Sequence, residues 1–118
     1  MKITSITSEM YRWKRTRPIA NGRHIYPTEE LGVVRIQTDE GITGIGYGNA
    51  AMASRFEPLL LSEDPLDTER LWYKMWVPKR VGRRGLSTQA ISAIDIALWD
   101  IKAKRADEHS RVRRRRLL

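Results

Sequence analysis

The chain has 118 residues, enough for one small domain with a modest hydrophobic core. Hydrophobic residues make up 41% and charged residues 31%, which are ordinary globular values and exclude an intrinsically disordered chain. Cysteine is absent, which excludes disulfides and thiolate metal sites, and no apolar run is long enough to cross a membrane. We therefore expect a soluble protein of the cytoplasm.

The net charge of +8 is unevenly distributed along the chain. Residues 107–118 hold five arginines and two acidic residues, a net of +3, whereas residues 1–106 combine 17 basic with 12 acidic residues. An arginine run can bind nucleic acid or another polyanion without specificity. This run lacks interleaved aromatic residues, and no charged helix face is evident upstream of it. A small basic module that binds a polyanion is therefore only the alternative function.

The first part of the chain predicts a strand and then a loop. Residues 2–15 carry apolar residues in imperfect alternation, which predicts a strand with a bulge. Residues 15–30, with the sequence RTRPIANGRHIYPTEE, contain two prolines and an Asn-Gly pair. These residues break any regular pattern, so we expect a loop of some length here.

A β-hairpin is predicted next. In LGVVRIQT, Val34, Ile36 and Thr38 alternate with polar residues, and ITGIGYG returns as the partner strand. Gly41 suits the positive φ of a three-residue turn with a bulge. Together with the first strand, this hairpin predicts a three-stranded antiparallel meander.

The pattern then becomes helical. The segment AAMASRFEPLL is a weak helix candidate, and DPLDTERLWYKMW is a better one, in which Asp64 can cap and Pro65 fits the first helical position. A turn-rich linker is expected over residues 77–87. Ser87 or Thr88 is expected to cap the last helix, which would end near Arg105. Strands followed by helices predict an α+β domain.

The last predicted helix has two apolar faces. A broad arc that can cover the sheet contains seven residues: Ala90, Ile91, Ala93, Ile94, Ala97, Leu98 and Ile101. A second stripe of Ile96, Trp99 and Ala103 lies on the other side. A helix on a small sheet needs only one apolar face. The second face thus predicts another domain or another subunit as partner, unless the preceding LWYKMW helix and its linker cover it.

Four stretches carry a resemblance to a known family: KITSI, VVRIQTDEGITGIGYG, EDPLDTERLWYKMW and GLSTQAISAIDIALWDIKAK. They resemble the N-terminal domain of the mandelate racemase and muconate lactonizing enzyme family, within the enolase superfamily. The resemblance implies that this α+β domain caps a modified TIM barrel. In that barrel, carboxylates bind Mg²⁺, and Lys or His bases remove a proton next to a substrate carboxylate.

A barrel of this kind needs about 200 residues or more, and only 13 follow Arg105. We therefore expect residues 1–106 to be the capping domain. Residues 107–118 are expected to be a disordered basic tail outside the family, such as a frameshift or a truncated reading frame would produce. The resemblance implies a fragment of a Mg²⁺-dependent acid-sugar dehydratase or racemase that is inactive alone and holds no cofactor itself. Dehydratase is favoured because RRGLSTQAISAIDIALWDIKAK looks most like those enzymes.

The predicted loop and the segment after the third strand are the candidate substrate contacts. By the resemblance, both fold over the mouth of the barrel. Arg17, Asn21, Arg23 and His24 supply donors and positive charge suited to an acidic sugar. Asn49 stands where many relatives place Glu in a Gly-Trp-Gly-Glu run, and this departure weakens the transfer of subgroup specificity.

Two further patterns are interpreted as structural. Lys102 and Lys104 resemble the catalytic Lys-x-Lys pair of the family, but at a solvated helix end they are expected only to pair with the helix dipole. Asp95 and Asp100 lie about 140° apart on a helix, so they cannot chelate one ion together. No catalytic or metal-ligating residue is predicted in this chain.

Overall fold

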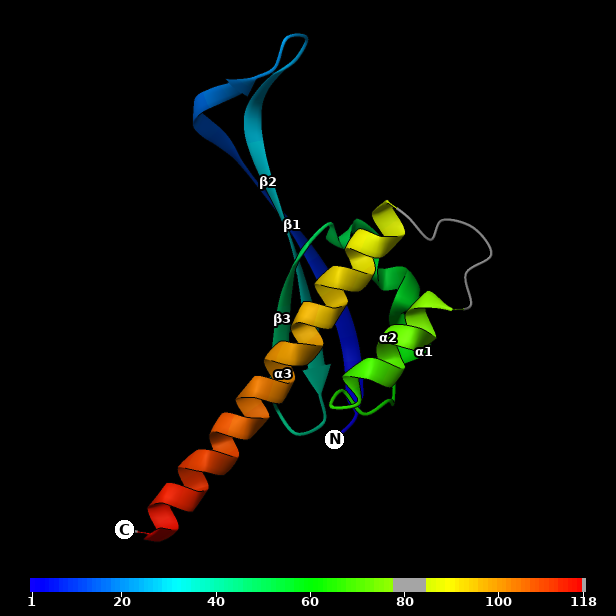
Figure 1. Ribbon diagram of the computed structural model, residues 1–118, viewed down its shortest axis with the longest axis vertical. Helices are drawn as coiled ribbons and strands as arrows, with labels where there is room; N and C mark the ends of the chain where they lie inside the picture. The colour runs from blue at the N-terminus through cyan, green and yellow to red at the C-terminus, as the bar shows by residue number, and fades with distance from the viewer. Residues whose placement is uncertain (78–84, 118) are drawn as a thin grey trace.

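The computed structural model describes residues 1–77 and 85–117. Three antiparallel strands form one sheet in the order β1-β2-β3, and helices follow them in the sequence (Figure 1). The elements in chain order are β1 (Ile3–Ala20), β2 (Ile25–Thr38), β3 (Thr43–Gly48), η1 (Ala50–Phe56), α1 (Glu57–Leu60), α2 (Thr68–Trp76) and α3 (Leu86–Leu117). The predicted α+β class and the three-stranded meander are confirmed.

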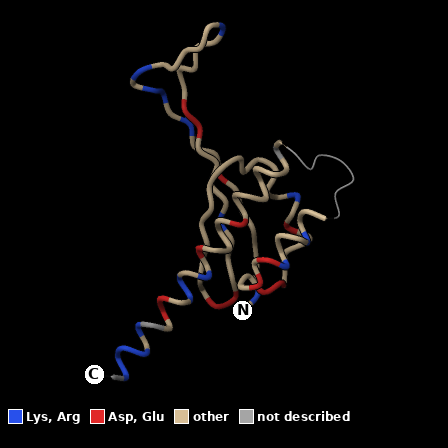
Figure 2. Tube along the Cα trace, viewed as in Figure 1, with Lys and Arg blue, Asp and Glu red and all other residues tan. Residues whose placement is uncertain are grey.

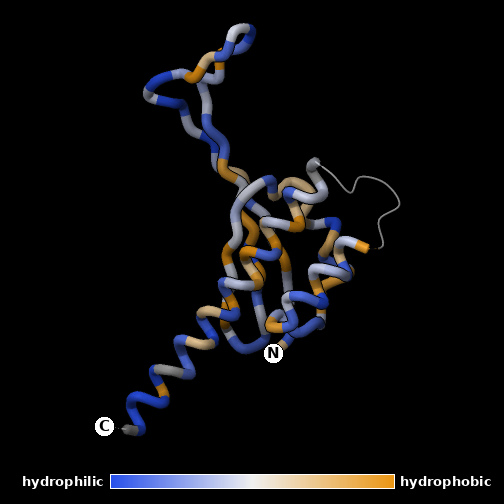
Figure 3. Tube along the Cα trace, viewed as in Figure 1, coloured by the Kyte–Doolittle hydropathy of each residue, from blue (hydrophilic) through white to orange (hydrophobic). Residues whose placement is uncertain are grey.

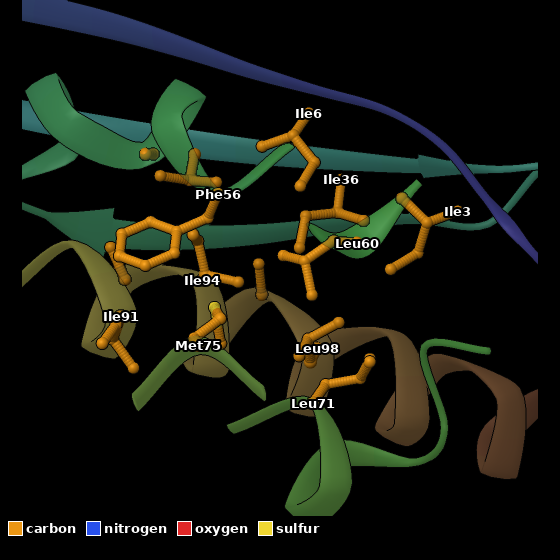
Figure 4. Close-up of a cluster of buried hydrophobic side chains, with 14 of the residues drawn as sticks. Ile3, Ile6, Ile36, Phe56, Leu60, Leu71, Met75, Ile91, Ile94 and Leu98 are labelled. Carbon is orange, nitrogen blue, oxygen red and sulfur yellow. The ribbon is translucent and has the colours of Figure 1, made fainter. Parts of the chain in front are cut away.

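The core lies between the sheet and α3, and the shorter helices close its side (Figure 4). Val34 and Ile36 of β2 are fully buried, as their alternation predicts. All seven residues of the predicted arc on α3 are buried as well, so this face covers the sheet. Leu71 and Met75 of α2 complete the core from the side. Figure 3 shows most apolar segments gathered in this body, a few more on the projecting hairpin, and a mostly hydrophilic distal half of α3.

Two glycines of β3 let the backbone of α3 lie directly on the strand. A Cβ atom at Gly46 would stand 1.8 Å from the carbonyl oxygen of Ala93, and one at Gly44 would stand 2.2 Å from that of Ala97. Neither space admits a side chain. The sequence GIGYG is therefore a packing motif in which each buried glycine faces a turn of the helix.

Side chains of α3 cap the outer edge of β3. Asp100 Oδ2 accepts a hydrogen bond from Ile45 N at 2.9 Å, and Lys104 Nζ donates to Thr43 O at 2.8 Å. The two side chains also pair with each other, with 2.7 Å between Nζ and Oδ2. Lys104 is thus structural, as expected, but it works through this clamp in mid-helix and not through a helix end.

The outer edge of β1 is capped near its start by the segment before α2. Ile3 N donates to Glu63 O and Ser62 N donates to Ile3 O, each at 2.9 Å. Ile6 N donates to the Glu57 carboxylate at 3.2 Å. Both outer edges of the sheet therefore carry partners within the body of the domain.

The loop predicted over residues 15–30 is wrong, because β1 and β2 continue through it as a long hairpin. The prolines are accommodated where pairing is interrupted. Pro18 lies within the register shift between Lys14 and Ile19, and Pro27 is skipped on the opposite strand. A proline lacks a backbone N–H, so it costs little at such a position.

Two helix starts also differ from the sequence analysis. Helix α2 begins at Thr68 with Asp67 at its N-cap, so Asp64 is not the cap and Pro65 is not the first helical residue. Both lie in the preceding turn, where Asp64 Oδ1 accepts a hydrogen bond of 2.9 Å from Leu66 N. Helix α3 begins at Leu86, which places Ser87 and Thr88 inside its first turn and not at the cap. The linker expected before it falls mostly on residues 78–84, outside the described residues.

Helix α3 does not end near Arg105 but continues to Leu117, so the tail expected to be disordered is helical. No glycine or proline follows Gly85, and arginine is a good helix former. Asp107 and Arg111 add an ion pair one turn apart, with 2.9 Å between Oδ2 and Nε. Among the described helices, α3 included, none is both long and apolar enough to span a membrane.

The ion pairs of Glu63 predict a pH dependence of stability. Arg70 Nη2 and Lys74 Nζ lie 2.6 Å and 2.5 Å from its carboxylate and lower its pKa from 4.5 to about 2. The folded state therefore binds a proton at Glu63 less readily than the unfolded chain does. Its contribution to the free energy of unfolding is complete above pH 4.5 and is lost as the pH falls toward about 2.

Urea unfolding at a series of pH values checks this prediction. Glu63→Gln is expected to flatten the dependence of the unfolding free energy on pH in the window between pH 4.5 and about 2. Glu69→Gln is the matched control, since Glu69 is exposed on α2 and forms no ion pair with a described residue. Identical slopes for Glu63→Gln and the unsubstituted chain would contradict the prediction.

Candidate functional site

The residues predicted to contact a substrate lie mainly on the distal part of the β1–β2 hairpin. This hairpin projects away from the body, on the side opposite to the C-terminal end of α3 (Figure 1). Arg17 lies on β1 in the interrupted stretch of pairing, while Asn21, Arg23 and His24 form the connection between the two strands. The structure thus brings three of the five predicted residues together at one turn.

Asn21 builds this turn. Its Oδ1 accepts hydrogen bonds from the backbone N–H groups of Arg23, at 3.0 Å, and His24, at 2.9 Å. Its own backbone N donates to His24 O at 2.9 Å. Asparagine commonly forms such side-chain turns, and the glycine that follows it tolerates the tight bend. The Asn21 side chain therefore has a structural function, while the side chains of Arg23 and His24 are exposed.

The cations of the hairpin fall into two groups. Arg12 pairs with Glu30 and Arg15 pairs with Glu29 across the strands, at 2.5 Å and 2.6 Å. In contrast, the side chains of Arg17 and Arg23 form no ion pair with any residue in the described part of the chain. Two guanidinium groups are thus available to an anionic ligand, and guanidinium binds a carboxylate through two parallel hydrogen bonds.

Exposed apolar side chains accompany these cations, and they form a surface that was not predicted from the sequence. Ile25 is 70% exposed and Ile19 is 54% exposed, and Trp13 and Tyr26 are each exposed over nearly half of their surface. Strand alternation could have revealed them, but the prediction of a loop removed that signal. Large apolar groups on a projecting hairpin indicate a surface that packs against another domain, another chain or a ligand.

Asn49 lies at the base of the hairpin, apart from the turn. It follows β3, and its Nδ2 donates to Gln89 Oε1 on α3 at 3.0 Å. A shallow hollow between Asn49, Met10 and Glu30 separates it from the strands of the hairpin. The structure therefore joins Asn49 to the start of α3 and does not bring it to Asn21.

The second apolar stripe on α3 is open. Ile96 is 37% exposed, Trp99 is 54% exposed and Ala103 is exposed, so the α2 helix does not cover them. A groove between α2 and α3 runs beside the stripe and is lined by Trp72 and Trp99, among others. Lys102 Nζ lies 4.7 Å from the centre of the Trp99 ring, a cation–π contact. Helix α2 therefore leaves the stripe partly open, and the linker that was expected to help cover it falls mostly outside the described residues.

The acidic residues of the described chain do not fit the magnesium that the family resemblance implies. No group of three or more His, Cys, Asp or Glu side chains that could hold a metal ion occurs within residues 1–77 and 85–117. Glu63 and Asp100 are engaged by basic side chains. Asp95 lies in the groove beside Trp99, where burial raises its pKa above the ordinary value.

A family model confirms the resemblance. The model of the mandelate racemase / muconate lactonizing enzyme N-terminal domain matches residues 3–109. The chain belongs to this family. The match contains the whole sheet and the short helices, together with the part of α3 that packs on them.

Two curated relatives from the family show what the chain is similar to. The D-galactarolactone cycloisomerase of Agrobacterium fabrum is 34% identical over 111 residues, which cover 88% of this chain and 29% of the relative. The L-talarate/galactarate dehydratase of Salmonella typhimurium is 40% identical over 92 residues, covering 68% of this chain and 23% of the relative. The chain therefore spans less than a third of the length of these relatives.

Solved structures from the enolase superfamily share the fold. A racemase from Streptomyces coelicolor A3(2) with bound magnesium has a TM-score of 0.81 and 34% identity, over 88% of this chain and 32% of that one. The L-talarate dehydratase from Polaromonas sp. JS666, complexed with Mg and L-glucarate, has a TM-score of 0.78 and 35% identity, over 89% and 32%. Both structures extend well beyond the part that this chain matches.

Proposed function

We propose that these residues are the substrate-capping domain of a Mg²⁺-dependent enzyme that acts on acid sugars in the cytoplasm. Dehydration is the favoured reaction, and racemisation or cycloisomerisation is the alternative. The observation that carries this proposal is the 40% identity to the L-talarate/galactarate dehydratase within a match to the family's N-terminal domain. In this proposal a barrel domain supplies the metal and the bases, and the chain has no activity alone.

The hairpin has the chemistry that such a cap needs. An acid sugar carries a carboxylate, and Arg17 and Arg23 are exposed guanidinium groups without an ion pair among the described residues. Each could donate hydrogen bonds to that carboxylate while the apolar side chains of the hairpin, Ile19 and Ile25, exclude water around it. His24 adds a further donor beside them, and Asn21 fixes the turn that presents them.

The open stripe of Ile96, Trp99 and Ala103 is the face that we propose for the partner. Its exposed aromatic and aliphatic groups and the adjoining groove suit a packed interface. The barrel domain is the favoured occupant, and a second copy of the chain is the alternative. Asn49, at the base of the hairpin, would lie on the substrate side of that interface.

A fusion protein tests this function. Residues 1–105 would replace the N-terminal domain of the Salmonella typhimurium dehydratase, and turnover of galactarate would be measured with Mg²⁺. We expect turnover by the fusion and none by the chain alone. Arg17→Ala with Arg23→Ala should lower kcat/KM by about 10-fold or more, since a charged hydrogen bond contributes roughly 1.5–3 kcal/mol.

Arg12→Ala is the matched control, because Arg12 lies on the same hairpin but is paired with Glu30. It should leave kcat/KM nearly unchanged. Turnover by the chain alone would contradict its inactivity. Equal losses in the control and in the double variant would contradict a role for Arg17 and Arg23 in binding.

A further inference from the structure

The distal half of α3 carries one face that is basic along its whole length and that the capping function does not use. Lys102, Arg105, His109, Arg113 and Arg116 follow one another at spacings of three or four residues. At 100° per residue they fall within an arc of about 80°. All five side chains are exposed, and we call this face the basic stripe.

Acidic residues lie outside the basic stripe. Asp100, Asp107 and Glu108 are roughly 60° or more from its edges at 100° per residue. Asp107 pairs with Arg111 on another face of the helix, at 2.9 Å. The basic stripe is therefore free of acidic side chains over this length, whereas the other faces of the helix carry charges of both signs. Figure 2 shows the basic residues gathered toward the C-terminal end.

The basic stripe begins on the body of the domain and does not belong to the arginine run alone. Lys102 lies over the ring of Trp99, and Arg105 Nη1 pairs with Glu40 Oε2 at 2.5 Å. Farther along, Arg113 and Arg116 form no ion pair with a described residue. The sequence alone predicts no charged helix face upstream of the run. The structure corrects this point, because the helix is continuous through both parts.

The length of the basic stripe suits a polymer of negative charges. From Lys102 to Arg116 the helix rises about 21 Å at 1.5 Å per residue. Each strand of duplex DNA carries one phosphate per roughly 3.4 Å along its axis, so such a row can contact several phosphates at once. A membrane surface suits it less, because an interfacial helix needs an apolar face and Val112 is the one large apolar residue between Lys102 and Arg116.

We propose that the basic stripe binds the phosphodiester backbone of nucleic acid without sequence specificity. Apart from Trp99 and the imidazole of His109, the helix offers no aromatic group for base stacking, so the phosphates are the part that it recognises. Three to four phosphate contacts would give log Kobs a slope of about −3 against log[NaCl] for duplex DNA.

The test measures fluorescence anisotropy of a labelled mixed-sequence DNA duplex with the full chain, between low and moderate NaCl concentrations. The double variant R113Q/R116Q should reduce the magnitude of the salt slope by about 2. The matched control R114Q/R115Q removes the same charge from other faces of the helix and should leave the slope nearly unchanged. R113K/R116K keeps the charge and should keep the slope.

Each other outcome overturns the proposal. Equal effects of R113Q/R116Q and R114Q/R115Q would mean that the total charge of the tail, and not one face, drives binding. Tighter binding to vesicles of phosphatidylserine and phosphatidylcholine than to the duplex would assign the stripe to a lipid surface. Absence of binding at low salt would show that the basic stripe does not bind the duplex. Circular dichroism of each variant verifies the helix, which Gln supports well.

Discussion

Replacing Gly46 with alanine is expected to destabilise the domain by about 3 kcal/mol or more. The new Cβ would stand 1.8 Å from the carbonyl oxygen of Ala93 and 2.9 Å from the backbone nitrogen of Ala97. Both contacts are with backbone atoms of α3, so no side-chain rotation can relieve them. The helix would have to move off the sheet, and the buried arc would lose its packing.

Urea unfolding followed by circular dichroism measures this effect. A chain of this size is held by roughly 6–18 kcal/mol, so the loss would be a large part of its stability. Gly22→Ala is the matched control, because no atom lies within 4 Å of a Cβ at Gly22 in the hairpin turn. An unchanged unfolding midpoint for Gly46→Ala would contradict the close approach of α3 to β3.

Ile94→Ala and Ile96→Ala are expected to differ strongly although the residues are two positions apart on one helix. Ile94 is fully buried against the sheet, and its truncation should cost about 2–5 kcal/mol. Ile96 is 37% exposed on the open stripe, and its truncation should change the free energy of unfolding by about 0.5 kcal/mol or less.

The same two variants also test whether the stripe of Ile96, Trp99 and Ala103 is a partner face. Sedimentation of the unsubstituted chain should show self-association if the stripe of Ile96 and Trp99 is an interface without its partner. Ile96→Ala should reduce that association while the fold persists. A comparable loss of stability in both isoleucine variants would mean that the chain packs both faces internally, and the partner face would be excluded.

The meander and the covering face of α3 could be predicted because their signals are local. Val34 and Ile36 alternate with polar residues at the period of a strand, and Ile94 and Leu98 recur at the period of a helix. The turn at Gly41 was also predictable, and its φ of +78° confirms the expectation. These features need no knowledge of distant parts of the chain.

The long hairpin and the helical tail differ from the predictions for two different reasons. Proline and Asn-Gly signals favour a loop locally, whereas the pairing of β1 with β2 resumes beyond the register shift at Ile19. In the tail, the departure from the family predicts a structural boundary that the fold does not have. The helix continues because nothing after Gly85 stops it.

The candidate site shows the limit of assigning binding residues by type. Arg17, Arg23 and His24 have exposed side chains, as a ligand contact requires. Asn21 and Asn49 also carry side-chain donors that could contact a ligand. However, Asn21 holds a turn, and Asn49 is hydrogen-bonded to Gln89, which lies 40 residues away in the sequence. The turn at Asn21 is local and typical of an Asn-Gly pair, whereas the pairing of Asn49 with Gln89 appears only once the chain is folded. The five assignments stay a prediction, of which the fusion protein tests Arg17 and Arg23.

The clamp of Asp100 and Lys104 on β3 limits how this domain can join other chains. An incoming strand would have to displace the carboxylate from Ile45 N and the ammonium from Thr43 O before it could extend the sheet. At the opposite edge of the sheet, Ser62 and Glu63 occupy the backbone groups of Ile3 on β1 in the same way. Fibril-like growth is thereby disfavoured on the body of the domain. The surfaces that remain for assembly with another domain or chain are the open stripe on α3 and the projecting β1–β2 hairpin.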